Sequence, residues 1–433
     1  MKRRNFLSDA VVGGLAAPFS PGLSRAARPA GRSIQVQAAS DPNRTLTQLG
    51  RWSLEEIRDY FQKELFDRRM PNWSKYGVDR TFGGFVSGWR RSGTLSADKW
   101  IGRQGRLLWL FSRFAPKAPA GLAFYEAARR AKEALVRNGR DQLGRWHSRL
   151  SKDWKVLDAG PSVDAGMGMA LGLAEYARTA EDSEAMRMAR DAADGVTEMV
   201  LAPHYQPYSG PIPLEPGTKA MATWNPLLAA ATSLAESGRP ESPAAIARMC
   251  VRFILQFHWQ RGQGCVLEYL RQDWTPFPSD SLGEGLGRVS GWRGVEAAWL
   301  VMAEALRSGN RQAFLEAAEL GNGTLEACWE EGGEPGLAEF DNIDLRRKSP
   351  SGTAGSGGAL ADALVFVLSA IEHTHSAEAV RWFDRIFGTV WSRPGVWNPA
   401  DEFHEPRGII LCLEILERMI DRRGQISPFL VTS

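Results

Sequence analysis

The fold is decided by two neighbouring stretches, GVEAAWLVMAEALRS at residues 294–308 and RQAFLEAAELGNGTLEAC at residues 311–328. In both, apolar residues recur at three- and four-residue intervals, the spacing that buries one face of an α-helix. Only Gly309 and Asn310 separate the two stretches. So short a connection predicts two helices packed against each other as a hairpin.

The same pattern continues through most of the chain from Ser53 onward, and turn residues interrupt it every ~15–25 residues. The pattern predicts about twelve helices. After a first helix that Ser53 opens, we expect helices at residues 100–114, 120–137, 163–180, 183–201, 225–237, 243–260, 294–308, 311–328, 358–372, 377–390 and 407–422. Segments rich in Gly, Asp and aromatic residues lie between several of them, at 81–85, 141–155 and 262–276, and predict small β-hairpins or loops.

We therefore expect an all-α fold, an (α/α)6 barrel formed by one domain over residues 50–425. Its inner helices should wall a central cleft, with the short hairpins and loops at the cleft end. An α-solenoid is the rival architecture. No repeat of fixed length is visible in the sequence to support it.

The N-terminus predicts a separate leader. Residues 1–39 hold the pair Arg3-Arg4, then Phe6, a mildly apolar run at 10–19 and a Pro/Ala/Arg-rich stretch. This arrangement is typical of a twin-arginine export signal, with a disordered basic tail as the alternative. The apolar run is too short for a stable membrane anchor. We expect a periplasmic or extracellular protein.

Charge and cysteine content exclude several classes of partner. The chain carries a formal net charge of +3, but residues 1–39 alone carry +5, which leaves about −2 for the remainder. Nucleic acid is therefore not an expected partner. Cys250, Cys265, Cys328 and Cys412 are widely spaced, so we expect no zinc or other metal site, and disulfide pairing stays open.

Several segments in order resemble the N-acylglucosamine 2-epimerase and cellobiose 2-epimerase superfamily. The matching segments are Gln104-Gly105-Arg106-Leu107-Leu108-Trp109, Gly144-Arg145-Trp146 to Asp153, Asn225-Pro226-Leu227-Leu228, Leu267-Glu268-Tyr269 to Trp274, Val295-Glu296-Ala297-Ala298-Trp299-Leu300, Leu360-Ala361-Asp362-Ala363-Leu364 and Phe403-His404-Glu405-Pro406-Arg407. They span about residues 55 to 420. In the family the segment at 225–228 opens a helix.

The resemblance implies a cofactor-free carbohydrate epimerase or isomerase that moves a proton at the carbon next to the carbonyl of a ring-opened sugar. A histidine suits this proton transfer, and hydrogen-bond donors hold the charge of the enediolate. The candidate catalytic residues are His404, Glu296 and Arg293. The candidate substrate-binding residues are Arg106, Asn225, Glu268, Asp362, Arg407 and Trp292. The substrate would be a mono- or oligosaccharide, and a homodimer is compatible with the sequence.

The chain departs from the family at one of its two histidines. The family has a histidine three positions before the glutamate matched by Glu296, where this chain has Arg293, which cannot serve as a base. A second position that is histidine in many members is Ala229. His404 is then the lone matched histidine. Epimerisation at C2 needs acid/base groups on both faces of the carbon, whereas aldose–ketose isomerisation needs one, so the loss favours an isomerase.

Other interpretations stay open. Glu296 and Glu268 can instead belong to buried ion pairs with Arg293 or Arg407. A glycoside hydrolase or polysaccharide lyase would use a carboxylate pair among Glu268, Glu296 and Asp362, and export fits such degradation. A non-catalytic sugar-binding barrel is the third alternative, which Arg293 keeps open. We also expect His147 and His258 to be structural, and His373 and His375 to be exposed at a helix end.

Overall fold

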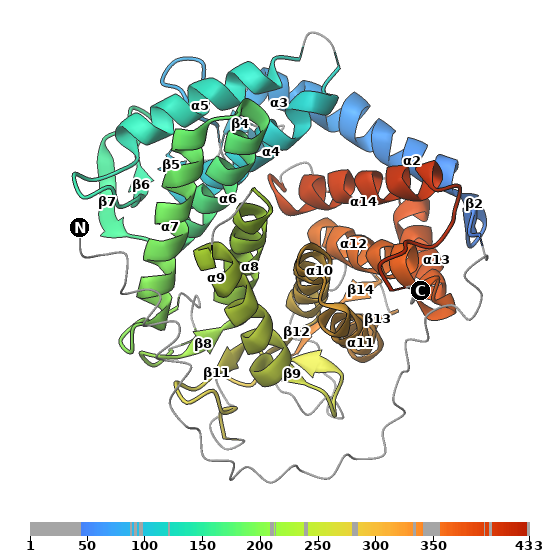
Figure 1. Ribbon diagram of the computed structural model, residues 1–433. Coiled ribbons are helices and arrows are strands. Elements are labelled where there is room, and N and C mark those ends of the chain that lie inside the picture. The colour runs from blue at the N-terminus through green and yellow to red at the C-terminus, as the bar shows by residue number, and fades with distance from the viewer. Residues whose placement is uncertain are drawn as a thin grey trace.

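Six helices form the inner wall of the molecule (Figure 1). They are α4 (Ile101–Phe114), α6 (Val163–Ala180), α8 (Met221–Glu236), α10 (Gly291–Ser308), α12 (Gly357–Thr374) and α14 (His404–Asp421). The computed structural model describes residues 45–86, 89–90, 93–94, 98–119, 122–207, 212, 214–237, 241–278, 285–331, 335–340, 356–393, 395–397 and 401–430. The predicted leader at residues 1–39 lies outside the described residues.

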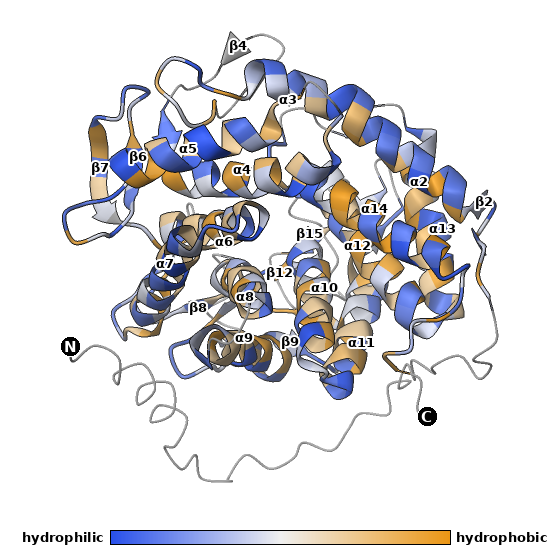
Figure 2. Ribbon diagram, turned by 45° about the horizontal axis from the view of Figure 1, so that its top comes forward, coloured by the Kyte–Doolittle hydropathy of each residue, from blue (hydrophilic) through white to orange (hydrophobic). Residues whose placement is uncertain are grey.

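Each inner helix packs against an outer helix (Figure 1). In the order of the inner helices, the partners are α5 (Phe124–Asn138), α7 (Ser183–Leu201), α9 (Glu241–Phe253), α11 (Arg311–Cys328), α13 (Ala377–Ser392) and α2 (Leu54–Gln62). Figure 2 shows hydrophilic and hydrophobic residues side by side on outer helices such as α2 and α5, as expected of helices with one solvated face. The six pairs confirm the predicted (α/α)6 barrel.

The α10–α11 hairpin illustrates why these residues form these elements. Ser290 caps α10 by accepting a hydrogen bond from the backbone N–H of Arg293. Gly309 ends the helix in the left-handed region, with φ of 73°, where glycine carries no steric penalty. Asn310 then caps α11 by accepting from the N–H of Ala313 over 3.1 Å. Two residues therefore suffice to reverse the chain.

Ion pairs close the ring between α14 and α4. Arg113 of α4 contacts Glu414 of α14 at 2.6 Å, and Lys117 contacts Glu417 at 2.7 Å.

The inner helix α12 is long and apolar enough to cross a membrane by composition alone. It is 94% buried within the protein, as expected of a core helix.

Glycines bring α4 and α6 into backbone contact. A Cβ atom on Gly105 would lie 2.2 Å from the carbonyl carbon of Gly168, and one on Gly172 would lie 2.1 Å from the carbonyl oxygen of Gly105. Side chains at these positions would push the two inner helices apart. The absence of a side chain at Gly105 thus sets the position of its neighbour Arg106 at the cleft.

Short antiparallel strands lead into the inner helices. The pairs are β5 (Lys99–Trp100) with β6 (His147–Leu150), β6 with β7 (Val156–Pro161), β8 (Lys219–Ala220) with β11 (Tyr269–Leu270), and β12 (Val289–Ser290) with β15 (Glu339–Phe340). Residues 99–100, 219–220 and 289–290 directly precede α4, α8 and α10. The predicted hairpins therefore lie at the end where the inner helices begin.

The remaining elements are peripheral. They are the strand pairs β1 (Gln48–Leu49) with β2 (Trp52–Ser53), β3 (Trp89–Arg90) with β4 (Gly93–Thr94), β9 (Trp259–Gln260) with β10 (Cys265–Val266) and β13 (Trp329–Glu330) with β14 (Gly336–Leu337), and the helices η1 (Lys63–Arg69), α3 (Met70–Tyr76), η2 (Ala115–Lys117) and η3 (Ile254–His258). Of these, η1 and η3 are π-helical.

Three details of the prediction are wrong. The helix expected from 225 begins at Met221, so Asn225 lies in its second turn and Pro226 inside it. The helix expected to run to 260 changes to π-helix at Ile254. His373 and His375 are buried, because the rings of Phe314 and Phe429 pack on His373 and the end of α12 lies inside the wall.

Candidate active site

Arg407 lies at the centre of a buried polar cluster at the cleft end of the inner helices. Its Nη2 atom is 2.9 Å from Oε1 of Glu296, 2.8 Å from Oδ1 of Asp362 and 3.2 Å from Nδ1 of His404. The guanidinium also stacks over the ring of Trp299, 5.0 Å from its centroid. Three inner helices, α10, α12 and α14, are joined through this one side chain.

Glu296 is bound on both sides of its carboxylate. Arg407 contacts Oε1, while Nη1 of Arg293 and Nδ2 of Asn225 each donate to Oε2 over 3.0 Å. Burial alone would raise the pKa of Glu296, but Arg407 and Arg293 hold it well below its usual range. Glu296 is therefore a fixed negative charge.

Asp362 is fully buried and accepts hydrogen bonds from two indoles. Nε1 of Trp292 donates to Oδ2 over 2.7 Å, and Nε1 of Trp299 donates to Oδ1 over 3.1 Å. Burial raises the pKa of Asp362 to about 6; Arg407 opposes this rise and Glu296 adds to it. With no exposed atoms and three donors, Asp362 organises the cluster and cannot reach a ligand in the cleft.

His404 is the accessible member of the cluster, with its side chain 29% exposed. It is the first residue of α14, and the carboxylate of Asp401 accepts hydrogen bonds from the N–H groups of Phe403 and His404. The ring meets Trp292 edge to face, with the centroids 4.8 Å apart. Burial and the charge of Arg407 hold the pKa of His404 well below its usual range, so the imidazole is neutral at pH 7.

Nδ1 of His404 lies between two different partners. Arginine has only donors, so the contact at 3.2 Å to Arg407 makes Nδ1 an acceptor and leaves the proton of the neutral ring on Nε2. Oε1 of Glu296 is 3.9 Å from the same nitrogen. The other tautomer, with its proton on Nδ1 and its lone pair on Nε2, would have Glu296 as an acceptor if the ring turned to close this distance. Each tautomer therefore has a partner of the right kind beside Nδ1.

Two arginines share the accessible surface with His404. The side chains of Arg293 and Arg106 are 25% and 26% exposed. Arg106 pairs with Asp164 of α6 at 2.8 Å, and both arginines act electrostatically on His404. Beneath them, Glu296 and Arg407 are only 3% and 6% exposed. The accessible side chains near His404 thus include two donors, Arg293 and Arg106, and the carboxylate of Asp164, which is 56% exposed and paired with Arg106.

Glu268 lies apart from the cluster. It is 5% exposed, and Oε1 accepts a hydrogen bond from the N–H of Ala222 over 3.3 Å. Burial raises its pKa, while Arg293 opposes the rise. No ion pair with Glu268 is found among the described residues. The alternative that the sequence left open, buried ion pairs of Glu296 and Glu268 with Arg293 or Arg407, therefore holds for Glu296 alone.

Glu296, Asp362 and His404 are also a group whose ligand atoms lie within 4.8 Å of one another, a spacing that suits a metal ion. The point between these atoms is filled by Nη2 of Arg407. A cation bound there would have to displace the guanidinium from all three. The residues present therefore fit an arginine-centred cluster better than a metal site.

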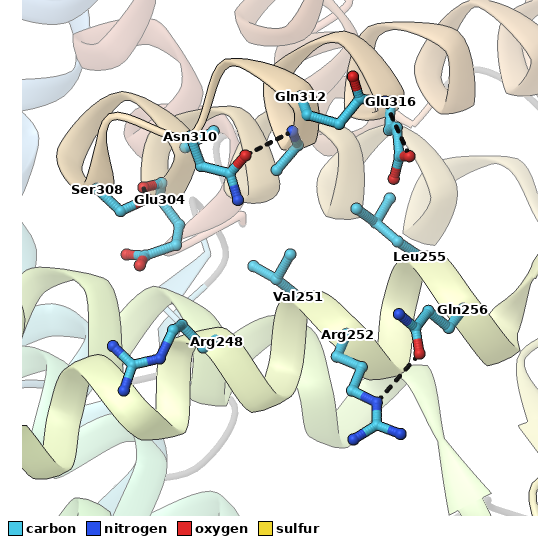
Figure 3. Close-up of a pocket in the computed structure, with 12 residues that line it drawn as sticks. Arg248, Val251, Arg252, Leu255, Gln256, Glu304, Ser308, Asn310, Gln312 and Glu316 are labelled. Carbon is cyan, nitrogen blue, oxygen red and sulfur yellow. Dashed lines mark hydrogen bonds between the residues drawn. The ribbon is translucent and has the colours of Figure 1, made fainter.

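Two surface grooves in the described part of the chain lie away from this cluster. One, of about 300 Å³, lies between α9 and the α10–α11 hairpin (Figure 3). Its walls carry Arg248 and Arg252 on one side and Glu304 and Glu316 on the other (Figure 3). The chemistry of the buried cluster, rather than the size of a groove, marks the candidate active site.

Most of the predicted site residues come together, while some of their neighbours were missed. His404, Glu296, Arg293, Asn225, Asp362, Arg407 and Trp292 form one network, and Arg106 lies at its accessible side. The missed residues are Trp299, Asp401, Arg69 and Glu405. Arg69 and Glu405 form a buried ion pair 2.5 Å apart, and Glu405 directly follows His404 in the sequence. Trp299 lies within a segment that matched the family, which was the available signal.

Comparison with known families identifies the protein as a carbohydrate-active enzyme of the isomerase and epimerase class. The model of the N-acylglucosamine 2-epimerase (GlcNAc 2-epimerase) family matches residues 83–395, and the chain belongs to this family. A search of curated protein sequences gives no match.

Solved structures share the fold at low sequence identity. Cellobiose 2-epimerase from Spirochaeta thermophila is 19% identical with a TM-score of 0.69, covering 85% of this chain and 98% of its own. A D-mannose isomerase is 13% identical with a TM-score of 0.66, covering 84% and 97%. A family 76 glycoside hydrolase (mannosidase) from Bacteroides thetaiotaomicron is 10% identical with a TM-score of 0.57, covering 84% and 100%. Such similarity establishes a common fold and leaves the reaction to the site.

Proposed function

We propose that the protein is an aldose–ketose isomerase that moves a proton between C1 and C2 of a ring-opened sugar, with His404 as its single acid/base residue. The observation that carries this proposal is that Arg293 occupies the position of the second family histidine and is bound to Glu296. Of the six histidines, only His404 lies in the cluster. A cis-enediol route needs one such group on one face of the sugar.

In this mechanism His404 takes the proton from C2 through Nε2. The Nδ1–H form, hydrogen-bonded to Glu296, provides the free lone pair. The imidazolium that results is stabilised by the fixed charge of Glu296. The hydroxyl proton on O2 passes to O1 of the enediolate, and the imidazolium returns its proton to C1, which leaves the carbonyl at C2. The low pKa of His404 keeps the neutral, proton-accepting form populated at neutral and mildly acidic pH.

The enediolate oxygens need donors, which Arg293 and Arg106 offer from the accessible side. Of the guanidinium nitrogens of Arg293, only Nη1 has a hydrogen-bond partner among the described residues. The other N–H groups of this side chain are therefore free for a substrate oxygen. The N-terminal turns of α10, α12 and α14 also point toward the cluster, and helix N-termini favour negative charge. Both features suit an anionic intermediate.

A glycoside hydrolase is less well supported. Glu296 and Asp362 are close enough for a retaining pair, but both are buried and both contact Arg407. Neither carboxylate is free to protonate a glycosidic oxygen or to attack an anomeric carbon.

We also propose, from the leader alone, that the enzyme is exported and acts on sugars outside the cytoplasm.

The test is exchange of carbon-bound hydrogen. The protein is incubated in D2O with a panel of aldoses and ketoses, and proton NMR follows loss of the C2 signal of aldoses and the C1 signals of ketoses. We expect one aldose–ketose pair to exchange and interconvert. Absence of exchange with every sugar, from protein with an intact helical circular dichroism spectrum, would refute the proposal.

A further inference from the structure

A second groove is lined by residues of α2, η1 and the end of α13. The helices α2 and α13 lie on the outer wall (Figure 1). Its volume is about 460 Å³, within the range of about 300–1,000 Å³ that ligand sites occupy. We propose that this groove is a binding site for a neutral saccharide, separate from the candidate active site. The inference is independent of the reaction proposed above.

An aromatic wall gives the groove its affinity for a sugar ring. Trp391 is 44% exposed, which is unusual for so large an apolar side chain. Its ring lies 5.4 Å from that of Tyr60 at an angle of 33°, and Phe387 packs against both rings. Supported from behind in this way, the indole presents a fixed face on which the C–H groups of a pyranose can stack.

Polar groups around the aromatic wall match the hydroxyl groups of a saccharide. Tyr60 accepts a hydrogen bond from Nε1 of Trp397 over 3.0 Å and keeps its own proton, because burial raises its pKa to about 12. Oδ2 of Asp59 and Oε1 of Glu56 have no hydrogen-bond partner among the described residues. The groove therefore offers the hydroxyl of Tyr60 as a donor and two free carboxylate oxygens as acceptors, in addition to the cationic side chains in its lining.

The charges that line the groove argue for a neutral ligand. Glu56, Asp59 and Glu64 carry three carboxylates, and Lys63, Arg68 and Arg393 carry three cations. With equal numbers of positive and negative side chains, the groove does not favour a charged ligand over an uncharged sugar. The groove of Figure 3 has charged residues on both walls but no aromatic residue in its lining, so it lacks the stacking surface.

Saturation-transfer NMR with neutral trisaccharides tests the proposal. The probes are cellotriose, maltotriose, xylotriose and mannotriose, with glucuronate and glucosamine as charged comparisons. We expect at least one trisaccharide to bind at millimolar concentration, and the Trp391→Ala variant to lose that binding by tenfold or more. Asp59→Asn, at a side chain 61% exposed, should weaken it severalfold without changing Tm.

The matched control is Tyr125→Ala, which removes an aromatic ring that is 45% exposed on α5, outside the groove. This variant should bind as the wild type does. The same experiment on His404→Ala separates the two sites, because a groove ligand stays bound when the candidate active site is altered. Equal binding by wild type and Trp391→Ala, or preference for a charged probe, would overturn the proposal.

Discussion

Nη1 of Arg293 donates to Oε2 of Glu296 over 3.0 Å, between residues three apart on α10. Arg293 stands where the resemblance to the family predicts a histidine, so Glu296 here neutralises an arginine. A group that can lose a proton has been replaced by one that cannot. Under the proposed mechanism, proton transfer is then confined to the face of the sugar on which His404 lies.

Restoring the histidine should restore the second face. In Arg293→His we expect the 2-epimer of the substrate to form alongside the ketose, since one positioned acid/base group contributes about 10²–10⁴-fold to rate. NMR of the product mixture measures the ratio of epimer to ketose. Arg293→Lys is the control, because it keeps the charge without a titrating group near pH 7. An epimer fraction equal in the two variants would contradict the assignment.

Removal of the histidine should stop the exchange. His404→Gln keeps a polar side chain of similar size but cannot take up a proton, and we expect hydrogen exchange into substrate to fall by about 10²–10⁴-fold. His204→Gln, at an exposed residue, should retain the wild-type rate. Exchange that persists in His404→Gln would mean that another residue is the base.

Arg407 should be more important for stability than any residue that it contacts. Arg407→Leu leaves Glu296 and Asp362 buried without their shared partner, and we expect the free energy of unfolding in urea to fall by about 3–5 kcal/mol. Glu296 keeps its contacts with Arg293 and Asn225, so adding Asp362→Leu removes the carboxylate that depends more on Arg407. The double variant should therefore be more stable than Arg407→Leu alone. If it is less stable, the cluster is not held by charge compensation.

Buried histidines should make the protein less stable in mild acid. Burial lowers the pKa of His258 and His373 to about 4, so the unfolded chain binds protons below about pH 6.5 that the folded chain does not. Stability is then complete above pH 6.5 and declines as the pH falls, by about 2 kcal/mol for each of these residues at pH 5. Urea unfolding at pH 7 and pH 5 gives the difference, and His373→Phe should reduce it by about one histidine's share. A difference unchanged by His373→Phe would show that His373 is already protonated in the folded protein.

Two glycine-to-alanine changes should act in opposite directions. In Gly105→Ala the new methyl group would lie 2.2 Å from the backbone of Gly168, and separation of α4 from α6 should lower Tm steeply or prevent folding. Gly195 lies in α7 with no atom within 4 Å of such a methyl group. Gly195→Ala should therefore stabilise the protein by about 0.5–1 kcal/mol, because alanine is the better helix former. Thermal unfolding of the two variants, compared with wild type, measures whether each substitution lowers or raises stability.

The helices were predictable because each one has a local signal. The apolar spacing in residues 294–308 and the turn at Gly309 depend only on neighbours in the chain, and the structure agrees with both. The order of the family segments likewise led to His404, Glu296 and Arg407. Asn225 was misplaced because the matching family segment at 225–228 opens a helix, whereas α8 begins at Met221 and continues through Pro226.

The contacts between distant segments were beyond the sequence. Arg69 and Glu405 are 336 positions apart, and no local pattern announces a pair at that distance. Whether Glu296 would orient a histidine or bind an arginine also depended on geometry across helices, and the structure has it contact both Arg293 and Arg407. The groove beside Trp391 likewise forms only when α2 and α13 pack together.

The inner helices all begin at one end of the barrel, next to the connections that carry the short strands. Six times the chain returns to that end, so six separate connections meet at the end of the barrel where His404 and Arg407 lie. Insertions or deletions in them can change which molecule is admitted while the wall that fixes His404 and Arg407 stays as it is. Divergence in what such a protein recognises can therefore accumulate one connection at a time, without a new fold.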